Sequence, residues 1–139
     1  MKKKQIISFI MSILCVCLLA IPTFASEVKA SDQIRAYSID ATSSAGSLNI
    51  KFSITGRTSM DKLGCESIEV YKKFGSSWIL STSFDESDPG MSKSSSIMHA
   101  NTITCAGVAG VEYKVVVTVF AENSVGRDTR TKTVYVTGK

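Results

Sequence analysis

Histidine is almost absent from this sequence, since His99 is the only one among 139 residues. Catalysis requires a positioned base, nucleophile or metal ion, and one histidine in a Ser/Thr-rich segment has no partner implied by spacing. A tetrahedral zinc site lacks ligands for the same reason. We therefore expect no enzymatic activity, no cofactor and no metal, and we interpret His99 as a partly exposed residue of a strand.

Outside the N-terminal residues 1–25, the sequence also has no large excess of positive or negative charge. Three of the 16 Lys and Arg residues lie at positions 2–4, whereas all 12 Asp and Glu residues lie after residue 25. The remaining 13 basic residues leave the rest of the chain at a net charge of +1. Nucleic-acid binding needs clustered Lys and Arg to neutralise phosphates, so the sequence does not favour a nucleic acid as the partner.

Helical periodicity is absent after residue 26, whereas alternation of apolar and polar residues recurs between turn signals. The clearest example is the segment 48–54, in which Asn49, Lys51 and Ser53 separate apolar residues. This pattern predicts an all-β domain. The predicted strands are residues 34–40, 48–54, 68–72, 78–84, 94–105, 113–121 and 127–137.

Two details of this pattern make specific predictions. Ser59 can cap one short helical turn over residues 60–63, which Gly64 would end, and we interpret this segment as the connection between two sheets. In the Ser/Thr-rich strand that starts at residue 94, Ile97 and Ile103 are the expected buried anchors.

Residues 1–25 have the pattern of a secretory signal peptide. Lysines fill positions 2–4, an apolar run covers 6–21, and Thr23 and Ala25 place small residues before a cleavage site. Cleavage after Ala30 is a second option. The alternative is a retained membrane anchor, but the apolar run is shorter than the roughly 20 residues that usually cross a bilayer. We expect a secreted domain of residues 26–139 that has no membrane contact after cleavage.

Two cysteines, Cys65 and Cys105, lie within this predicted mature domain. Thiols exported from the reducing cytosol usually pair, so we predict a disulfide between them. Two free, partly buried thiols and an intermolecular bridge are the alternatives.

The strand that begins at Tyr113 resembles the F strand and F–G turn of fibronectin type III domains. The matching residues are Tyr113-x-Val115-x-Val117-x-Val119-x-Ala121-x-Asn123-x-x-Gly126. The resemblance implies a seven-stranded antiparallel β-sandwich of the immunoglobulin-like kind, in which Tyr113 forms the structural tyrosine corner. One departure is that Ile50 and Phe52 stand where such domains usually carry a tryptophan. In a regular sandwich of this kind, Cys65 and Cys105 would lie at opposite ends, which opposes the predicted disulfide.

The chain after residue 25 is also similar to short secreted proteins of Gram-positive bacteria that have no assigned activity. The matching residues are Leu48-x-Ile50-x-Phe52, Met60-Asp61-x-Leu63-Gly64, Ile68-x-Val70-Tyr71, Gly75-x-x-Trp78 and Gly107-Val108-Ala109-Gly110-x-x-Tyr113. This resemblance implies no particular function.

Two groups of residues are candidate binding sites. Trp78, with Tyr71 and Phe74 across a hairpin, could form an exposed aromatic surface for a protein or a sugar, although Trp78 could instead pack into the core. The loop carboxylates of Asp85, Glu86 and Asp88 could gather around calcium, but their spacing is not that of an EF-hand and favours a solvated turn.

The sequence therefore predicts a secreted, non-enzymatic β-sandwich module that binds a protein or glycan of the cell envelope. One alternative is a carbohydrate-binding module that uses Trp78. Another is a small effector or inhibitor that inserts the loop of residues 85–94 into its target.

Overall fold

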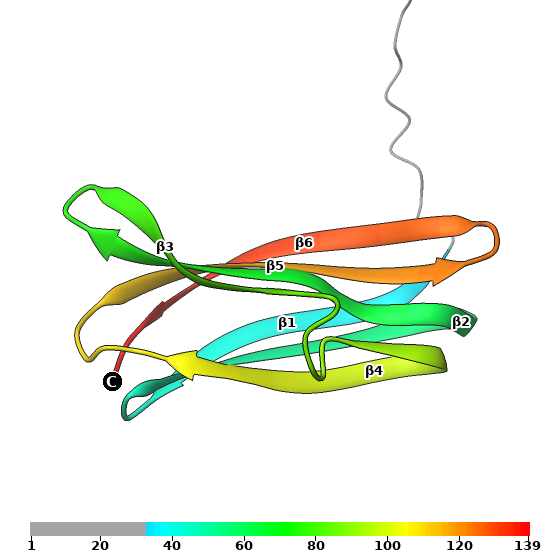
Figure 1. Ribbon diagram of the computed structural model, residues 1–139, viewed down its shortest axis with the longest axis horizontal. Coiled ribbons are helices and arrows are strands. Elements are labelled where there is room, and N and C mark those ends of the chain that lie inside the picture. Colours follow the sequence, from blue (N-terminus) through cyan, green and yellow to red (C-terminus); the bar gives the residue numbers. More distant parts are fainter. Residues whose placement is uncertain (1–32) are drawn as a thin grey trace, which may run out of the picture. The chain divides into compact units, whose positions relative to one another are not determined.

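The computed structural model describes residues 33–139, which form an antiparallel, all-β unit (Figure 1). The predicted signal peptide lies outside the described residues. The strands are β1 (Ile34–Ser44), β2 (Ser47–Phe74), β3 (Ser77–Asp85), β4 (Ser92–Ala106), β5 (Glu112–Asn123) and β6 (Gly126–Thr137). No helix, and hence no membrane-spanning helix, occurs between residues 33 and 139.

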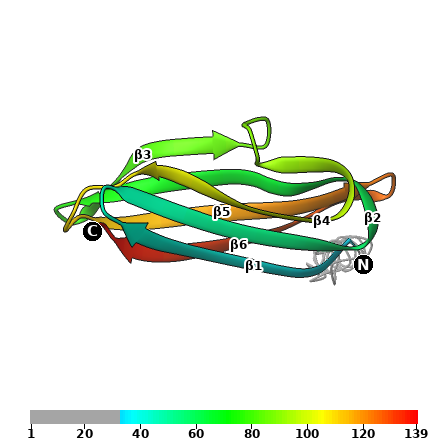
Figure 2. The same cartoon turned by 90° about the horizontal axis from the view of Figure 1, so that it is seen from below.

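The long strand β2 belongs to two parts of one curled sheet. Its first part, up to Thr55, lies between β1 and β4, and its last part, from Ser67, lies between β3 and β5. β6 continues the sheet beyond β5. Figures 1 and 2 show β2 and β4 bending back together at the same end of the unit, so that the two parts of the sheet face each other. This arrangement is compatible with a β-sandwich.

The structure contains six strands among the described residues, so the prediction of seven is wrong. The predicted helical turn at residues 60–63 is also wrong, because Met60 pairs with Ser96 and Leu63 with Lys93 in a continuous ladder. The register shift between Thr55 and Met60 marks the bend. Strands at the corner of a folded sheet often change direction through such bends without ending, and the capping signal of Ser59 is overridden by this pairing.

The core lies between the two parts of the sheet and is built from the alternating residues that the sequence pattern indicates. The first part of β2 contributes Leu48, Ile50 and Ile54, and β5 contributes residues such as Val115 and Val117, all fully buried. On β4, Ile103 is buried as predicted, whereas Ile97 is 51 % exposed because it lies at the bend.

The core is closed on both sides, where the edges of the two parts of the sheet face each other. On one side, the Lys132 ammonium of β6 donates to the Ile39 carbonyl of β1 at 2.9 Å. On the other side, the loop between β3 and β4 lies over the opening and buries Met91 completely. Gly64 allows this close approach, since a Cβ there would lie only 2.3 Å from the Met91 carbonyl oxygen, and its φ of 154° is unfavourable for other residues.

The predicted disulfide is not present, because Cys65 and Cys105 are both free thiols. Cys65 lies beside Val119 on β5, whereas Cys105 lies beside Leu48, near the end of β4 that leads to β5. The stretch from Tyr113, which lies at that end of β5, to Val119 spans about 20 Å at the rise of a strand. A disulfide requires Cα atoms within about 7 Å.

Candidate functional site

Three aromatic residues share the outer face of the sheet part formed by β3, β2, β5 and β6. Tyr71 lies on β2 beside the buried Val70, so its side chain points away from the core. Trp78 of β3 and Tyr135 of β6 reach toward each other across the intervening strands, and their ring centroids are 5.8 Å apart. We call Tyr71, Trp78 and Tyr135, with the lysines between them, the aromatic platform.

Two lysines lie among the rings of the aromatic platform. The Lys114 ammonium lies 4.6 Å from the ring centroid of Tyr71 and 5.4 Å from that of Trp78. The Lys73 ammonium lies 5.7 Å from the Trp78 centroid. Such cation–π contacts contribute about 0.5–1 kcal/mol each at exposed positions, so they favour this arrangement of rings and ammonium groups.

The charges of the platform are only partly balanced. Lys73 forms an ion pair with Glu112 at 3.3 Å, and the Tyr71 hydroxyl donates to Glu69 at 2.8 Å. This hydrogen bond to Glu69 raises the pKa of Tyr71. Within the described part of the chain, Lys114 has no carboxylate at ion-pair distance. The platform therefore offers an ammonium group, flanked by two rings, to an incoming partner.

The platform differs from the surface predicted from the sequence in two respects. Trp78 and Tyr71 are partly buried and share the platform, but Phe74 is 70 % exposed and, by strand alternation, points toward the opposite face from Tyr71. Tyr135, 59 % exposed, takes its place. The sequence carried one usable signal for Tyr135, since it alternates with Val134 and Val136, but its position opposite Lys114 follows only from the register of β5 and β6.

Tyr113 is buried at the start of β5, where its ring is 2 % exposed. Its hydroxyl accepts a hydrogen bond of 2.9 Å from the backbone amide of Val108 in the preceding connection. The side chain therefore ties the β4–β5 connection to the core.

The acidic loop after β3 uses its carboxylates internally. Asp85 accepts hydrogen bonds from the amide and the hydroxyl of Ser87, and these bonds lower its pKa. Asp88 accepts from the Asp85 amide at 2.8 Å. Between residues 33 and 139, no three His, Cys, Asp or Glu residues gather as metal ligands would.

Glu86 connects this loop to the outer face of the sheet. Its carboxylate lies 2.8 Å from the Lys62 ammonium and 2.7 Å from the guanidinium of Arg127. Hydrogen bonds from Arg127 and then from Lys62 lower the pKa of Glu86 to about 2. Arg127 also binds Glu122 at 2.7 Å and covers the ring of Phe120, which is fully buried.

His99 lies partly exposed on β4. One ring nitrogen, Nε2, is 2.8 Å from the Gly90 carbonyl, and the ring packs at 5.5 Å from that of Phe52. The Asn101 amide donates to the same carbonyl at 2.8 Å. His99 and Asn101 therefore hold the loop before β4 in place.

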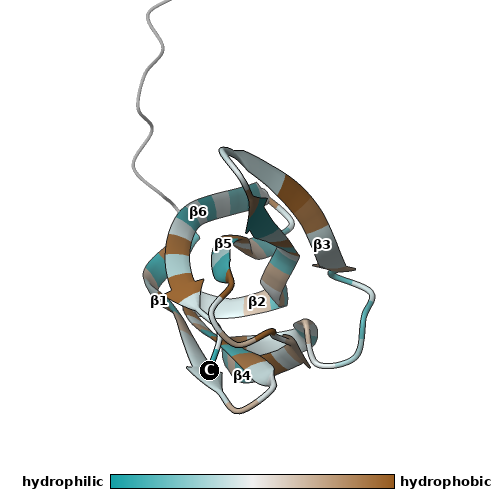
Figure 3. Ribbon diagram, turned by 90° about the vertical axis from the view of Figure 1, so that its left-hand side faces the viewer, coloured by the Kyte–Doolittle hydropathy of each residue, from teal (hydrophilic) through white to brown (hydrophobic). Residues whose placement is uncertain are grey.

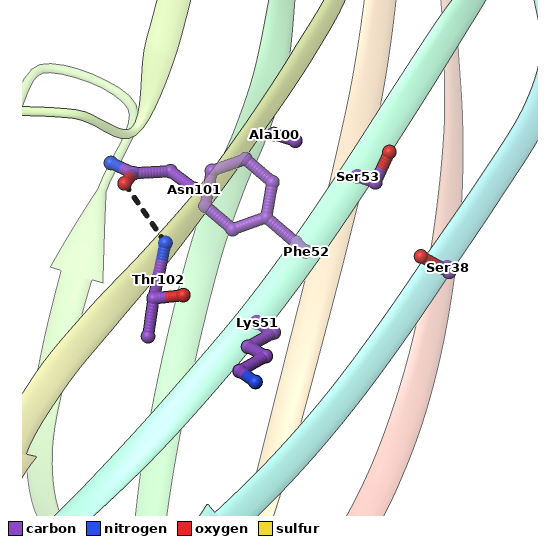
Figure 4. Close-up of a pocket in the computed structure, with 7 residues that line it drawn as sticks. All are labelled: Ser38, Lys51, Phe52, Ser53, Ala100, Asn101 and Thr102. Carbon is purple, nitrogen blue, oxygen red and sulfur yellow. Dashed lines mark hydrogen bonds between the residues drawn. The ribbon is translucent and has the colours of Figure 1, made fainter.

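A shallow hollow of about 400 Å³ lies on the other part of the sheet, formed by β1, β2 and β4 (Figure 4). It is lined by Ser38, Lys51, Phe52, Ser53, Ala100, Asn101 and Thr102. Figure 4 shows the Thr102 amide bonded to the Asn101 carboxamide oxygen at 2.9 Å. Its only charged lining residue is Lys51.

The fold and the platform define an antiparallel all-β domain that presents aromatic and cationic side chains on one outer face. Comparison of the chain with protein-family models, with curated proteins and with solved structures finds no match.

Proposed function

We propose that this chain is a secreted, non-enzymatic binding module with a fibronectin type III-like β-sandwich, and that its aromatic platform contacts a protein or glycan of the cell envelope. The observation that carries the proposal is the arrangement of Trp78 and Tyr135 around Lys114 on an outer face. Aromatic anchors supply large contact area at low entropic cost and are common at the centre of binding surfaces.

Two observations support the fibronectin-like topology. The hydrogen bond from the Val108 amide to the Tyr113 hydroxyl has the geometry expected of a tyrosine corner. When β2 is divided at its bend, β1, the first part of β2 and β4 form one layer of the proposed sandwich, and β3, the last part of β2, β5 and β6 form the other. This strand order supports the proposed fold.

The leader pattern of residues 1–25 supports export, and an exported chain would present the platform outside the cell. The net charge of the remaining chain is near zero, which does not favour nucleic acid as the partner, because binding to nucleic acid needs an excess of Lys and Arg near the phosphates.

A cell-wall retention assay tests the proposal. The full sequence is expressed with its leader, and the chain recovered from the medium is incubated with purified Gram-positive cell walls. We expect retention of the wild type and at least a tenfold weaker affinity for Trp78→Ala and for Tyr135→Ala, because each removes one of the two paired rings. Tyr37→Ala is the matched control, since Tyr37 is 42 % exposed and lies on β1, in the other part of the sheet. Equal retention of all variants, or no retention of the wild type, would contradict the proposal, as would failure of export.

A carbohydrate-binding module is the second candidate, because the tilted ring pair of Trp78 and Tyr135 can stack on the apolar face of a sugar. Protease-treated walls separate the two candidates. Retention that survives removal of wall proteins indicates a glycan ligand, whereas retention that is lost with them indicates a protein partner.

A further inference from the structure

The outer edge of β3 is unpaired and carries no charge. β3 pairs with β2 along one edge, and no other strand of the described chain lies beside it. The eight residues 77–84 include no charged residue and no proline. Ile79 and Leu80 are 45 % and 52 % exposed, and Figure 3 shows this hydrophobic stretch in brown on the outermost strand. Four of the eight residues are Ser or Thr, so the edge is mixed in polarity but uncharged, and an unpaired, uncharged edge is a template for pairing with another strand.

The other edge strands carry charges or coverings that β3 lacks, and the irregularity of β3 is a register shift that leaves Ser81, next to Leu80, without a partner on β2. β6 carries Arg130 and Lys132, and the Lys132 ammonium bridges to β1, which shields both of these edges. β4 is held by the loop that binds His99 and Asn101 through the Gly90 carbonyl. Natural sheets block their edges with such charges and coverings. The lack of such charges and coverings at β3 therefore indicates that its free edge pairs with another strand.

We propose that β3 pairs with β3 of a second copy of this chain, antiparallel and centred near Leu80, to form a two-fold symmetric dimer. A second copy fits because an uncharged strand meets no like-charge repulsion when it faces itself. Symmetric pairing also covers the edge in both copies, so association stops at two chains and does not continue into a fibre. The loop carboxylates begin at Asp85, beyond the uncharged stretch, which limits the pairing to residues 77–84.

The pairing would place two aromatic platforms on one surface. A two-fold axis perpendicular to a sheet keeps the outer faces of both copies on the same side, so Trp78 of each copy would face the same direction. A repetitive surface such as a cell wall could then bind both platforms at once, which increases the apparent affinity. This gain depends on the function proposed above, but the association itself does not.

Sedimentation equilibrium of the recovered chain, without any ligand, tests the dimer. Because one strand pair buries a small area, we expect a reversible dimer with a dissociation constant on the order of tens of micromolar. Leu80→Lys would place two ammonium groups close together at the axis and weaken association at least tenfold. Val125→Lys is the matched control, since Val125 is 82 % exposed in the β5–β6 turn and should leave the dimer unchanged.

Charge complementation tests the pairing itself. Leu80→Lys and Leu80→Glu chains should each be monomeric, with circular dichroism like that of the wild type, and an equimolar mixture of the two should dimerise. A wild type that stays monomeric at several hundred micromolar would overturn the proposal. A Leu80→Lys dimer as stable as the wild type, or a mixture that stays monomeric, would also overturn it.

Discussion

At the scale of single residues, the structure depends on a few buried polar atoms whose partners are fixed. The Tyr113 hydroxyl is one of them, because it is the acceptor for the Val108 amide in the connection between β4 and β5. An amide that loses its only protein partner must bind water or stay unsatisfied. The contribution of this hydroxyl can therefore be measured separately from that of the ring.

Tyr113→Phe removes the hydroxyl and keeps the ring. We expect the free energy of unfolding to fall by about 1–2 kcal/mol, since the Val108 amide loses its acceptor. Urea unfolding followed by the fluorescence of Trp78 measures the change. Tyr37→Phe is the control, because that side chain is 42 % exposed on β1 and its loss should cost less than about 0.5 kcal/mol. Equal losses in the two variants would show that the hydrogen bond contributes nothing.

At the scale of elements, the alternation of apolar residues predicted most strands, but it did not predict how they join. Segments such as 48–54 and 113–121 appear as expected, because burial of one face imposes a period of two on the sequence. Residues 55–64 were expected to leave the sheet, since Ser59 and Gly64 are typical helix-end residues. Their ladder with β4 depends on a partner distant in the sequence, which local pattern does not encode.

The same limit applies to the candidate site. Trp78 and Tyr71 were identified from their proximity across a hairpin, which a sequence shows directly. Tyr135 and Lys114 join them only because β6 and β5 continue the sheet in a particular register. Phe74 lies near them in the hairpin but on the opposite face, because position near a hairpin does not by itself determine which face a side chain occupies.

The loop between β3 and β4 is an element held to the sheet by charge, and this makes its attachment dependent on pH. Glu86 has a pKa of about 2 in the folded chain, below the ordinary value of 4.5. A lowered pKa means that the stabilisation is complete above about pH 4.5 and is lost as the pH falls toward 2. The side chains of Glu86 and Arg127 are each 29 % exposed, so solvent screening reduces the net contribution to about 1 kcal/mol.

Glu86→Gln should therefore lower the free energy of unfolding by about 1 kcal/mol at pH 7, and the difference from the wild type should disappear near pH 2. Urea unfolding at several pH values gives both quantities. Glu66→Gln is the matched control, because Glu66 lies 3.5 Å from Arg127 and contacts it less closely. A loss at pH 7 no larger than that of the control, or a difference that persists at pH 2, would refute the assignment.

At the scale of the whole domain, the described unit has no internal disulfide, so its stability depends on its core. The described unit buries Cys65 completely, and its thiol lies 3.3 Å from the carbonyl oxygens of Ser67 and Thr118. Burial raises the pKa of Cys65 to about 12 and also raises the pKa of Cys105. The thiolate is the form that reacts, so at pH 8 its fraction at Cys65 is lowered about a thousandfold.

The chain should consequently unfold at the same urea concentration with and without a reducing agent. In the folded state at pH 8, alkylation by iodoacetamide should modify Cys105 faster than Cys65, because Cys105 is only partly buried. After unfolding, both should react at similar rates, which provides the internal control. Peptide mass spectrometry of the alkylated chain reports both sites. The strand register keeps Cys65 and Cys105 too far apart for a disulfide. A peptide pair linked through these two residues, or a midpoint that falls on reduction, would contradict this prediction.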